Sequence, residues 1–166
     1  MNLKGQYSIA NSFQNLCKLT ELYLSSNTLI DQLQDLMEKL SCSKNTLEFL
    51  QLSNNSFTGP FPDIAKFSSL KSFYANSNKL NGTLPVSLGT LPDFSGASSL
   101  QILSLSHNKI NAILSESIGN LSKLKLLDLS SNSLNGTVSE YKFSNLYDLK
   151  TLDVSDNSLT LNLGLN

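Results

Sequence analysis

The stretch LKLLDLSSNSLNGTVSE, residues 124–140, decides the fold of this chain because two patterns meet in it. Its leucines alternate with other residues, as they do in a strand that buries one face. Asn132 follows at a position where the same alternation requires another apolar side chain. If this asparagine has a structural role, it should recur along the chain at a fairly regular interval.

The asparagine recurs in six copies of the pattern LxxLxLxxNx[LIVF], at intervals of 28, 23, 30, 24 and 25 residues. We expect six repeats in residues 19–166, after a partial repeat in residues 1–18, in one continuous solenoid without recognisable caps. The copies begin at Leu19, Leu47, Leu70, Leu100, Leu124 and Leu149. Their asparagines are Asn27, Asn55, Asn78, Asn108, Asn132 and Asn157.

Stacking of the copies explains why each one carries leucines at alternating positions. In each LxL segment both leucines point to one face of a short strand, and the residue between them points to the other. One coil cannot bury its apolar row alone, but strands stacked about 4.8 Å apart form a parallel sheet over a continuous core. About three coils are the practical minimum for such a core, so six copies are enough.

The recurring asparagine lies where the chain turns out of the strand and brings backbone N–H and C=O groups into a dry interior. An unpaired backbone group that is buried there destabilises the fold. Asparagine carries two donors and an acceptor, so it can satisfy the turn and bridge to the neighbouring coil. We therefore interpret the six asparagines as a structural ladder and not as catalytic residues.

The segments that follow the ladder indicate a subfamily. FTGPFPDIAKFSSL from Phe57 and LNGTLPVSLGTLP from Leu80 resemble the [LF]xGxIPxxLxxLxxL tail of plant extracellular leucine-rich repeats. Later tails depart from it, with Ala112 in place of glycine and Ser115 and Ser139 in place of proline. The chain resembles the ectodomains of plant receptor-like proteins and receptor-like kinases. That resemblance implies an α/β solenoid, a right-handed coil with a concave parallel β-sheet and a convex side of irregular, 3-10 and short helical segments.

Several parts expected from that resemblance are not found in the sequence: a signal peptide, a cysteine-paired N-terminal cap, a C-terminal cap, a membrane helix and a kinase domain. We therefore expect a fragment or a truncated product, whose uncapped ends are its weakest points and allow self-association. The resemblance implies the extracellular face of the plasma membrane or the cell wall. A chain expressed as written, without a signal peptide, would instead be cytoplasmic.

Composition excludes some classes of partner. The chain has 12 basic and 13 acidic residues, a formal net charge of −1, and no run of lysine or arginine that could follow a phosphate backbone. We therefore expect no nucleic acid partner. Nowhere do 18 apolar residues run together, so we also expect no membrane span in these residues.

Two intervals are longer than the others because they contain inserts. In the first, Leu33, Leu36, Met37 and Leu40 have helical spacing, which predicts a helix on the convex side. In the third, TLPDFSGASS at residues 90–99 predicts a surface loop.

The two cysteines lie about one coil apart. Cys17 precedes the first expected strand and Cys42 precedes the second, so the solenoid should bring them near each other. The sequence alone leaves two alternatives for these cysteines: a disulfide in an oxidising compartment, or a pair of half-buried thiols.

Function in this architecture is expected on the concave face, at positions between and after the strand leucines. The column between the leucines contains Tyr23, Gln51, Tyr74, Ser104, Asp128 and Asp153. The N-terminal part of the face is aromatic and the C-terminal part is acidic. Tyrosine also simply suits a strand surface, which is the structural alternative. The candidate partner-binding residues are Tyr23, Phe49, Gln51, Tyr74, Asp128, Asp153 and Asp156.

Catalysis by two aspartates is a hypothesis that the sequence makes unfavourable. Asp128 and Asp153 on adjacent strands would lie about 5 Å apart, which is the carboxylate spacing of retaining glycosidases. An open concave sheet, however, supplies no pocket that excludes water. His107 has no serine, cysteine or metal-ligand cluster in register with it. We expect no catalytic residue, no metal site and no cofactor.

Four sequons for N-glycosylation occur, a number that this composition produces by chance. Asn81 and Asn135 each follow a ladder asparagine by three residues and should project from the same flank, which leaves the concave face open. A glycan on Asn54 would crowd that face. The four candidates are Asn54, Asn81, Asn120 and Asn135.

Three functional classes follow. The leading hypothesis is a non-catalytic recognition module in defence or development signalling, which binds a peptide, a protein ligand or a receptor-kinase co-receptor through its concave face. The second is a blocker of cell-wall hydrolases, like the similar plant solenoids that inhibit polygalacturonases. The third is an intracellular scaffold or a non-functional truncated receptor product.

Overall fold

The structure is a computed structural model that describes residues 11–84, 99–114 and 116–162. The expected surface loop at residues 90–99 lies almost entirely outside these residues. The first ten residues of the partial repeat and Ser115 lie outside them as well.

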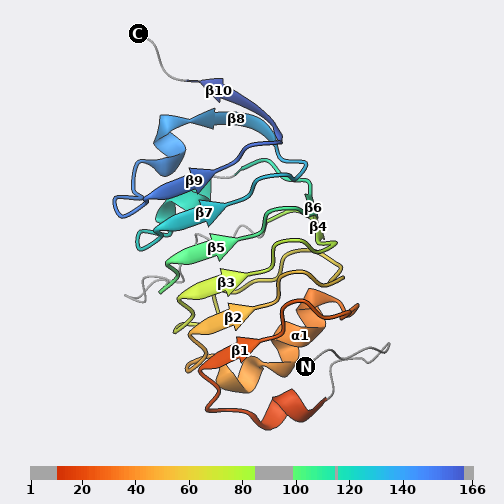
Figure 1. The fold of residues 1–166 in the computed structure, drawn as a ribbon. Coiled ribbons are helices and arrows are strands. Elements are labelled where there is room, and N and C mark those ends of the chain that lie inside the picture. The colour runs from red at the N-terminus through yellow and green to blue at the C-terminus, as the bar shows by residue number, and fades with distance from the viewer. Residues whose placement is uncertain (1–10, 85–98, 115, 163–166) are drawn as a thin grey trace.

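Each of the six repeats contributes one short strand to a single parallel sheet, in the order β1-β2-β3-β5-β7-β9. Figure 1 shows these strands stacked one above the other, with the connecting segments completing each coil. The predicted leucine-rich repeat solenoid is thereby confirmed. The strands are β1 (Glu21–Tyr23), β2 (Phe49–Gln51), β3 (Ser72–Tyr74), β5 (Ile102–Ser104), β7 (Leu126–Asp128) and β9 (Thr151–Asp153).

The middle residue of each strand points into the core, as the LxL pattern predicts. Leu50, Phe73, Leu103 and Leu127 are fully buried in the middle of the sheet. The equivalent Leu152 on the last strand is 41% exposed. Among the described strands, β9 is the last of the sheet, so no strand leucine pairs with Leu152 on its outer side.

The predicted helix is present as α1 (Leu33–Lys39). Leu33, Leu36 and Met37 are buried, and the C-cap residue Leu40 is buried too, because their spacing places all four on one helix face. The described residues also contain four 3-10 helices: Asn11–Asn15, Ser41–Ser43, Glu116–Asn120 and Glu140–Phe143.

Two small parallel sheets lie just after the ladder and were not predicted from the sequence. One pairs β4 (Asn81–Gly82) with β6 (Lys109–Ile110), and the other pairs β8 (Asn135–Ser139) with β10 (Ser158–Asn162). Gly136 in β8 has a φ of 88°, and a Cβ on it would lie 3.2 Å from Cγ2 of Ile113. A residue with a side chain here would therefore have an unfavourable backbone conformation, and Ile113 would have to move slightly to make room for its Cβ.

Candidate partner-binding face

Five ladder asparagines make the same hydrogen bonds. The Nδ2 of Asn132 donates to the carbonyls of Leu129 (3.1 Å) and Ser130 (3.1 Å) in its own turn and of Leu105 (3.0 Å) in the preceding coil. Its Oδ1 accepts from the N–H of Ile110 (3.0 Å). Asn55, Asn78, Asn108 and Asn157 repeat this arrangement. Each of these amides therefore joins two coils.

Asn27, in the first coil, donates to the carbonyls of Leu24 (2.9 Å) and Ser25 (3.1 Å) within its own turn. Within the described ranges, no buried side-chain nitrogen or oxygen lacks a hydrogen-bond partner. The buried polar side chains of this part of the solenoid are thus satisfied, as a dry core requires.

The residue before each ladder asparagine has a left-handed backbone, a feature that the sequence analysis missed. In all six coils its φ lies between 52° and 56°. Asn, Asp and His tolerate this conformation better than most residues, and three of the six positions hold one of them. The six residues are Ser26, Asn54, Ser77, His107, Ser131 and Asp156. His107 and Asp156 are therefore turn residues, not strand residues.

The sheet register fixes the columns of the concave face. Tyr23, Gln51, Tyr74, Ser104, Asp128 and Asp153 are in register across the six strands, which is the central column expected from the sequence. A parallel column precedes it by two residues and contains Glu21, Phe49, Ser72, Ile102, Leu126 and Thr151.

Three tilted rings lie side by side across the first three strands, and we call Tyr23, Phe49 and Tyr74 the aromatic cluster. The ring centroids of Tyr23 and Phe49 are 4.9 Å apart, and those of Phe49 and Tyr74 are 5.6 Å apart. Tyr23 is 60% exposed, and the other two rings are half-buried. The Tyr23 hydroxyl donates to Glu21 (3.1 Å), and this bond raises the pKa of Tyr23, so the phenol stays neutral. The cluster is an apolar surface with one fixed polar edge.

Farther along the central column, on β7, the side chain is an aspartate, Asp128, and not an aromatic residue. Its Oδ1 accepts from the Ser130 hydroxyl (2.7 Å) and N–H (3.1 Å), and its Oδ2 accepts from the Ser104 hydroxyl (3.2 Å). Partial burial raises the pKa of Asp128, but hydrogen bonds from Ser130, Ser106 and Ser104 outweigh burial and hold this pKa below its ordinary value. Asp128 is therefore an ionised, oriented carboxylate.

Two other column residues bind the serine two positions later in the same way. Asp153 Oδ1 accepts from the hydroxyl (2.6 Å) and N–H (3.0 Å) of Ser155, and Gln51 Oε1 accepts from the hydroxyl (2.6 Å) and N–H (3.2 Å) of Ser53. Asp156 accepts from the hydroxyl of Ser131 (3.2 Å). These bonds depend on side-chain rotamers, so the repeat pattern alone could not reveal them.

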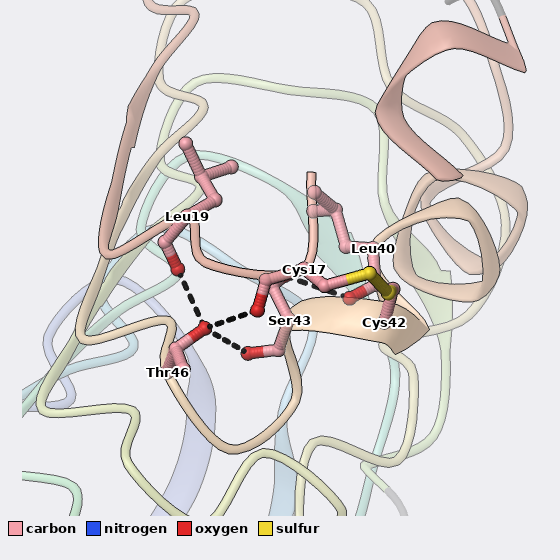
Figure 2. Close-up of a disulfide and its surroundings, with 6 residues drawn as sticks. All are labelled: Cys17, Leu19, Leu40, Cys42, Ser43 and Thr46. Atoms are coloured by element: carbon pink, nitrogen blue, oxygen red, sulfur yellow. Dashed lines mark hydrogen bonds between the residues drawn. A yellow bond between two sulfur atoms is a disulfide. The ribbon is translucent and has the colours of Figure 1, made fainter. Parts of the chain in front are cut away.

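A disulfide joins Cys17 and Cys42, whose Cα atoms are 4.6 Å apart. Figure 2 shows it beside the turn that leads into β2. The hydroxyl of Thr46 lies within hydrogen-bond distance of the carbonyls of Leu19 (2.9 Å), Cys17 (3.2 Å) and Ser43 (3.2 Å). The disulfide therefore connects the segment before β1 to the segment before β2.

The four sequon asparagines are all exposed. Asn81 and Asn135 begin β4 and β8, in the two small sheets beyond the ladder, and Asn135 Nδ2 donates to Asn111 Oδ1 (3.2 Å). Asn120 ends a 3-10 helix. Asn54 lies in the left-handed turn after β2, three residues beyond Gln51 of the central column. Glycosylation at these residues stays a prediction.

No three His, Cys, Asp or Glu side chains of the described residues are grouped so that they could hold a metal ion. Among these residues, no helix has the length and apolar character needed to cross a membrane.

Comparison with known proteins gives the chain its family. Leucine-rich repeat models match residues 46–67, 69–91, 94–134 and 123–146, which together make up more than half of the chain. The receptor-like protein EIX2 of Solanum lycopersicum is 40% identical over 81 residues, which are 49% of this chain and 8% of that protein.

Solved structures agree over a longer span. A TDR receptor is similar with a TM-score of 0.78 and 33% identity, over 91% of this chain and 24% of the receptor chain. The plant peptide hormone receptor RGFR1, solved in complex with RGF2, has a TM-score of 0.77 and 26% identity, over 91% of this chain and 22% of the receptor chain. This chain thus spans less than a quarter of either receptor. Its matches and its asparagine-linked coils show that it belongs to the leucine-rich repeat family, in the form found in the ectodomains of plant receptor-like proteins and receptor kinases.

Proposed function

We propose that this chain is a non-catalytic recognition module that binds a peptide or protein through its concave face. The observation that carries the proposal is the aromatic cluster, three neighbouring rings on three successive strands with Tyr23 more than half exposed. Exposed aromatic side chains on a rigid sheet combine a large apolar area with a small loss of conformational entropy, which is typical of interface anchors.

The similarity to receptors supports a peptide as the partner. RGFR1, a plant peptide hormone receptor that is similar to 91% of this chain, was solved in complex with RGF2. A linear peptide also suits the columns of this sheet, because each strand contributes one side chain to each column at a regular spacing. A role in defence or development signalling is part of the proposal.

We propose an extracellular site of action. Disulfides persist in oxidising compartments, and the pairing of Cys17 with Cys42 supports such a location. The exposed sequons Asn81 and Asn135 would be modified only there, and both lie beyond the ladder, away from the central column.

The test is a selection of random linear peptides displayed on phage against the immobilised chain. Peptides that it enriches are then measured by biolayer interferometry on the parent, on Tyr74→Ala and on Lys123→Ala, a control at an exposed residue outside the strands. We expect Tyr74→Ala to speed dissociation several-fold while the association rate changes little. Equal dissociation from parent and Tyr74→Ala, or loss of binding in Lys123→Ala alone, would place the site elsewhere and overturn the proposal.

A further inference from the structure

The concave face carries aromatic side chains on its first three strands and two neighbouring aspartates on its last two, while Glu21 on the first strand accepts a hydrogen bond from Tyr23. Among the described strands, the central column and the column before it contain carboxylates, hydroxyls, one amide, and aromatic and aliphatic side chains, but no lysine or arginine. The aromatic cluster lies on β1 to β3, and the two aspartates lie on β7 and β9. Charge complementarity therefore favours a ligand that is apolar at one point and cationic at another.

The sheet sets the distance between those two points. Tyr74, Ser104, Asp128 and Asp153 occupy successive strands of the central column. With about 4.8 Å between neighbouring strands, Asp128 lies about 10 Å from Tyr74 along the column and Asp153 lies about 14 Å from it.

The carboxylates keep capacity for a cation. Both hydrogen bonds that Asp153 accepts from Ser155 go to Oδ1, whereas Asp128 accepts hydrogen bonds from Ser130, Ser104 and Ser106. Each carboxylate oxygen offers two lone pairs, so Oδ2 of Asp153 can accept N–H donors, and Asp128, in register with it on the neighbouring strand, adds a second negative charge. The serine donors also fix the direction of the carboxylates before a ligand arrives, which lowers the entropy lost on binding.

The lysines closest in sequence to the two aspartates lie just before the strands. Lys125 and Lys150 precede Asp128 and Asp153 by three residues, which is about 10 Å along an extended strand. Nζ of Lys125 donates to Oε1 of Gln101 (2.9 Å), so this lysine has a partner of its own. The two aspartates thus face the concave side without an adjacent cation from their own strands.

We infer that the ligand is a linear peptide that lies across the strands, with an aromatic or bulky apolar residue on the aromatic cluster and an arginine about three or four residues away on Asp128 and Asp153. This inference rests on the proposed function and adds the ligand's composition and spacing. An extended peptide advances about 3.3 Å per residue, so three to four residues span 10 to 14 Å. Arginine fits better than lysine because its planar guanidinium can donate to two carboxylates at once.

The test uses a set of synthetic peptides with one tryptophan and one arginine separated by a rigid run of prolines. A polyproline helix advances about 3.1 Å per residue, so two to four intervening prolines span the proposed distance, whereas none or about eight do not. Each peptide has a twin in which neutral citrulline replaces arginine. Dissociation constants are measured by fluorescence on the parent and on Asp128→Asn, Asp153→Asn and Tyr74→Ala.

With two to four prolines, we expect the arginine peptide to bind about fivefold more tightly than its citrulline twin, and this advantage to shrink as salt is added. The advantage should be lost on Asp128→Asn or Asp153→Asn, and it should be small for the shortest and longest spacers. Circular dichroism establishes that the variants remain folded.

The two proposals fail in different ways. If neither peptide of any pair binds, or if both bind Tyr74→Ala as well as the parent, the aromatic cluster is not an anchor and the proposed function falls with the inference. Both peptides of a pair can bind through Tyr74 while arginine gives no gain in affinity at any spacing, or the same gain at every spacing. In that case the proposed spacing between the apolar and the basic residue is wrong, and the proposed function stands. An advantage that survives in both aspartate variants would also overturn the inference.

Discussion

The first three coils and the last three coils of the solenoid share a core but present different surfaces. Leu50 in β2 and Leu127 in β7 are both fully buried, and Asn55 and Asn132 make the same set of ladder bonds. On the concave face, however, the first half carries the aromatic cluster and the second half carries Asp128 and Asp153. The repeat thus determines which residue types occupy the buried positions. The residues of the concave columns can differ from coil to coil, and these residues can contact a ligand.

The two halves also differ in what stabilises them. The first half is joined by the disulfide between Cys17 and Cys42 and covered by α1, whereas the second half has the small sheet of β8 and β10. In the last coil the strand leucine Leu152 is 41% exposed. Stability should therefore be unequal along the solenoid even though the repeats are alike.

The largest expected effect compares two leucines that are in register. Leu127→Ala removes a fully buried side chain and should lower the free energy of unfolding by about 4 kcal/mol, whereas Leu152→Ala should lower it by about 1 kcal/mol. Urea denaturation followed by circular dichroism measures both. Equal losses would mean that the last coil is packed as well as the inner ones.

The ladder should be equally important in both halves. Asn78→Leu and Asn132→Leu each leave three carbonyls and one N–H without their side-chain partner, which should destabilise the fold by about 3 kcal/mol. Asn145→Leu, at an exposed residue, is the matched control and should be close to neutral. Denaturation curves that are the same for Asn132→Leu and the control would refute the ladder.

The features that the sequence predicts are those that recur along the chain. The strands, the core leucines, the helix at Leu33–Lys39 and the ladder positions all recur with a period or a face, so one sequence is enough to locate them. The small sheets are different, because their pairing depends on the turn after the ladder and on glycines such as Gly136 with a φ of 88°.

The candidate site was predictable only in part. Column membership of Tyr23, Tyr74 and Asp128 followed from alternation along the strands. The bonds from serine hydroxyls to Asp128 did not, because they depend on rotamers and on the distance between coils. The cysteine pairing needed the 4.6 Å separation of two Cα atoms, which no spacing in the sequence gives.

The disulfide should stabilise only the first half. Cys17 and Cys42 are 25 residues apart, so replacing both with serine should lower the free energy of unfolding by about 2 to 3 kcal/mol through the loop that the bond closes. Hydrogen exchange followed by mass spectrometry should show faster exchange around β1 and β2 and little change around β7. Uniformly faster exchange in both halves would show that the solenoid unfolds as one unit and that the comparison of halves does not extend to stability.

The smallest expected effect concerns acid and separates the carboxylate half from the aromatic half. Hydrogen bonds from serines hold the pKa of Asp128 below its ordinary value despite partial burial, so its ionised form favours the folded state. This contribution is fully present above the unfolded pKa of about 3.9 and is lost as the pH falls through the lower folded-state pKa. Solvent screening keeps it below about 1 kcal/mol.

Asp128→Asn should therefore flatten the dependence of the unfolding free energy on pH below about pH 4, measured by urea denaturation in a series of acidic buffers. Gln51→Ala is the matched control, because Gln51 makes the same pair of bonds to a serine two residues later but has no carboxyl group to titrate. Its curve should run parallel to that of the parent chain. If Asp128→Asn also runs parallel, the serine hydroxyls do not favour the ionised carboxylate, and the proposal of an arginine at this end of the face loses its electrostatic support.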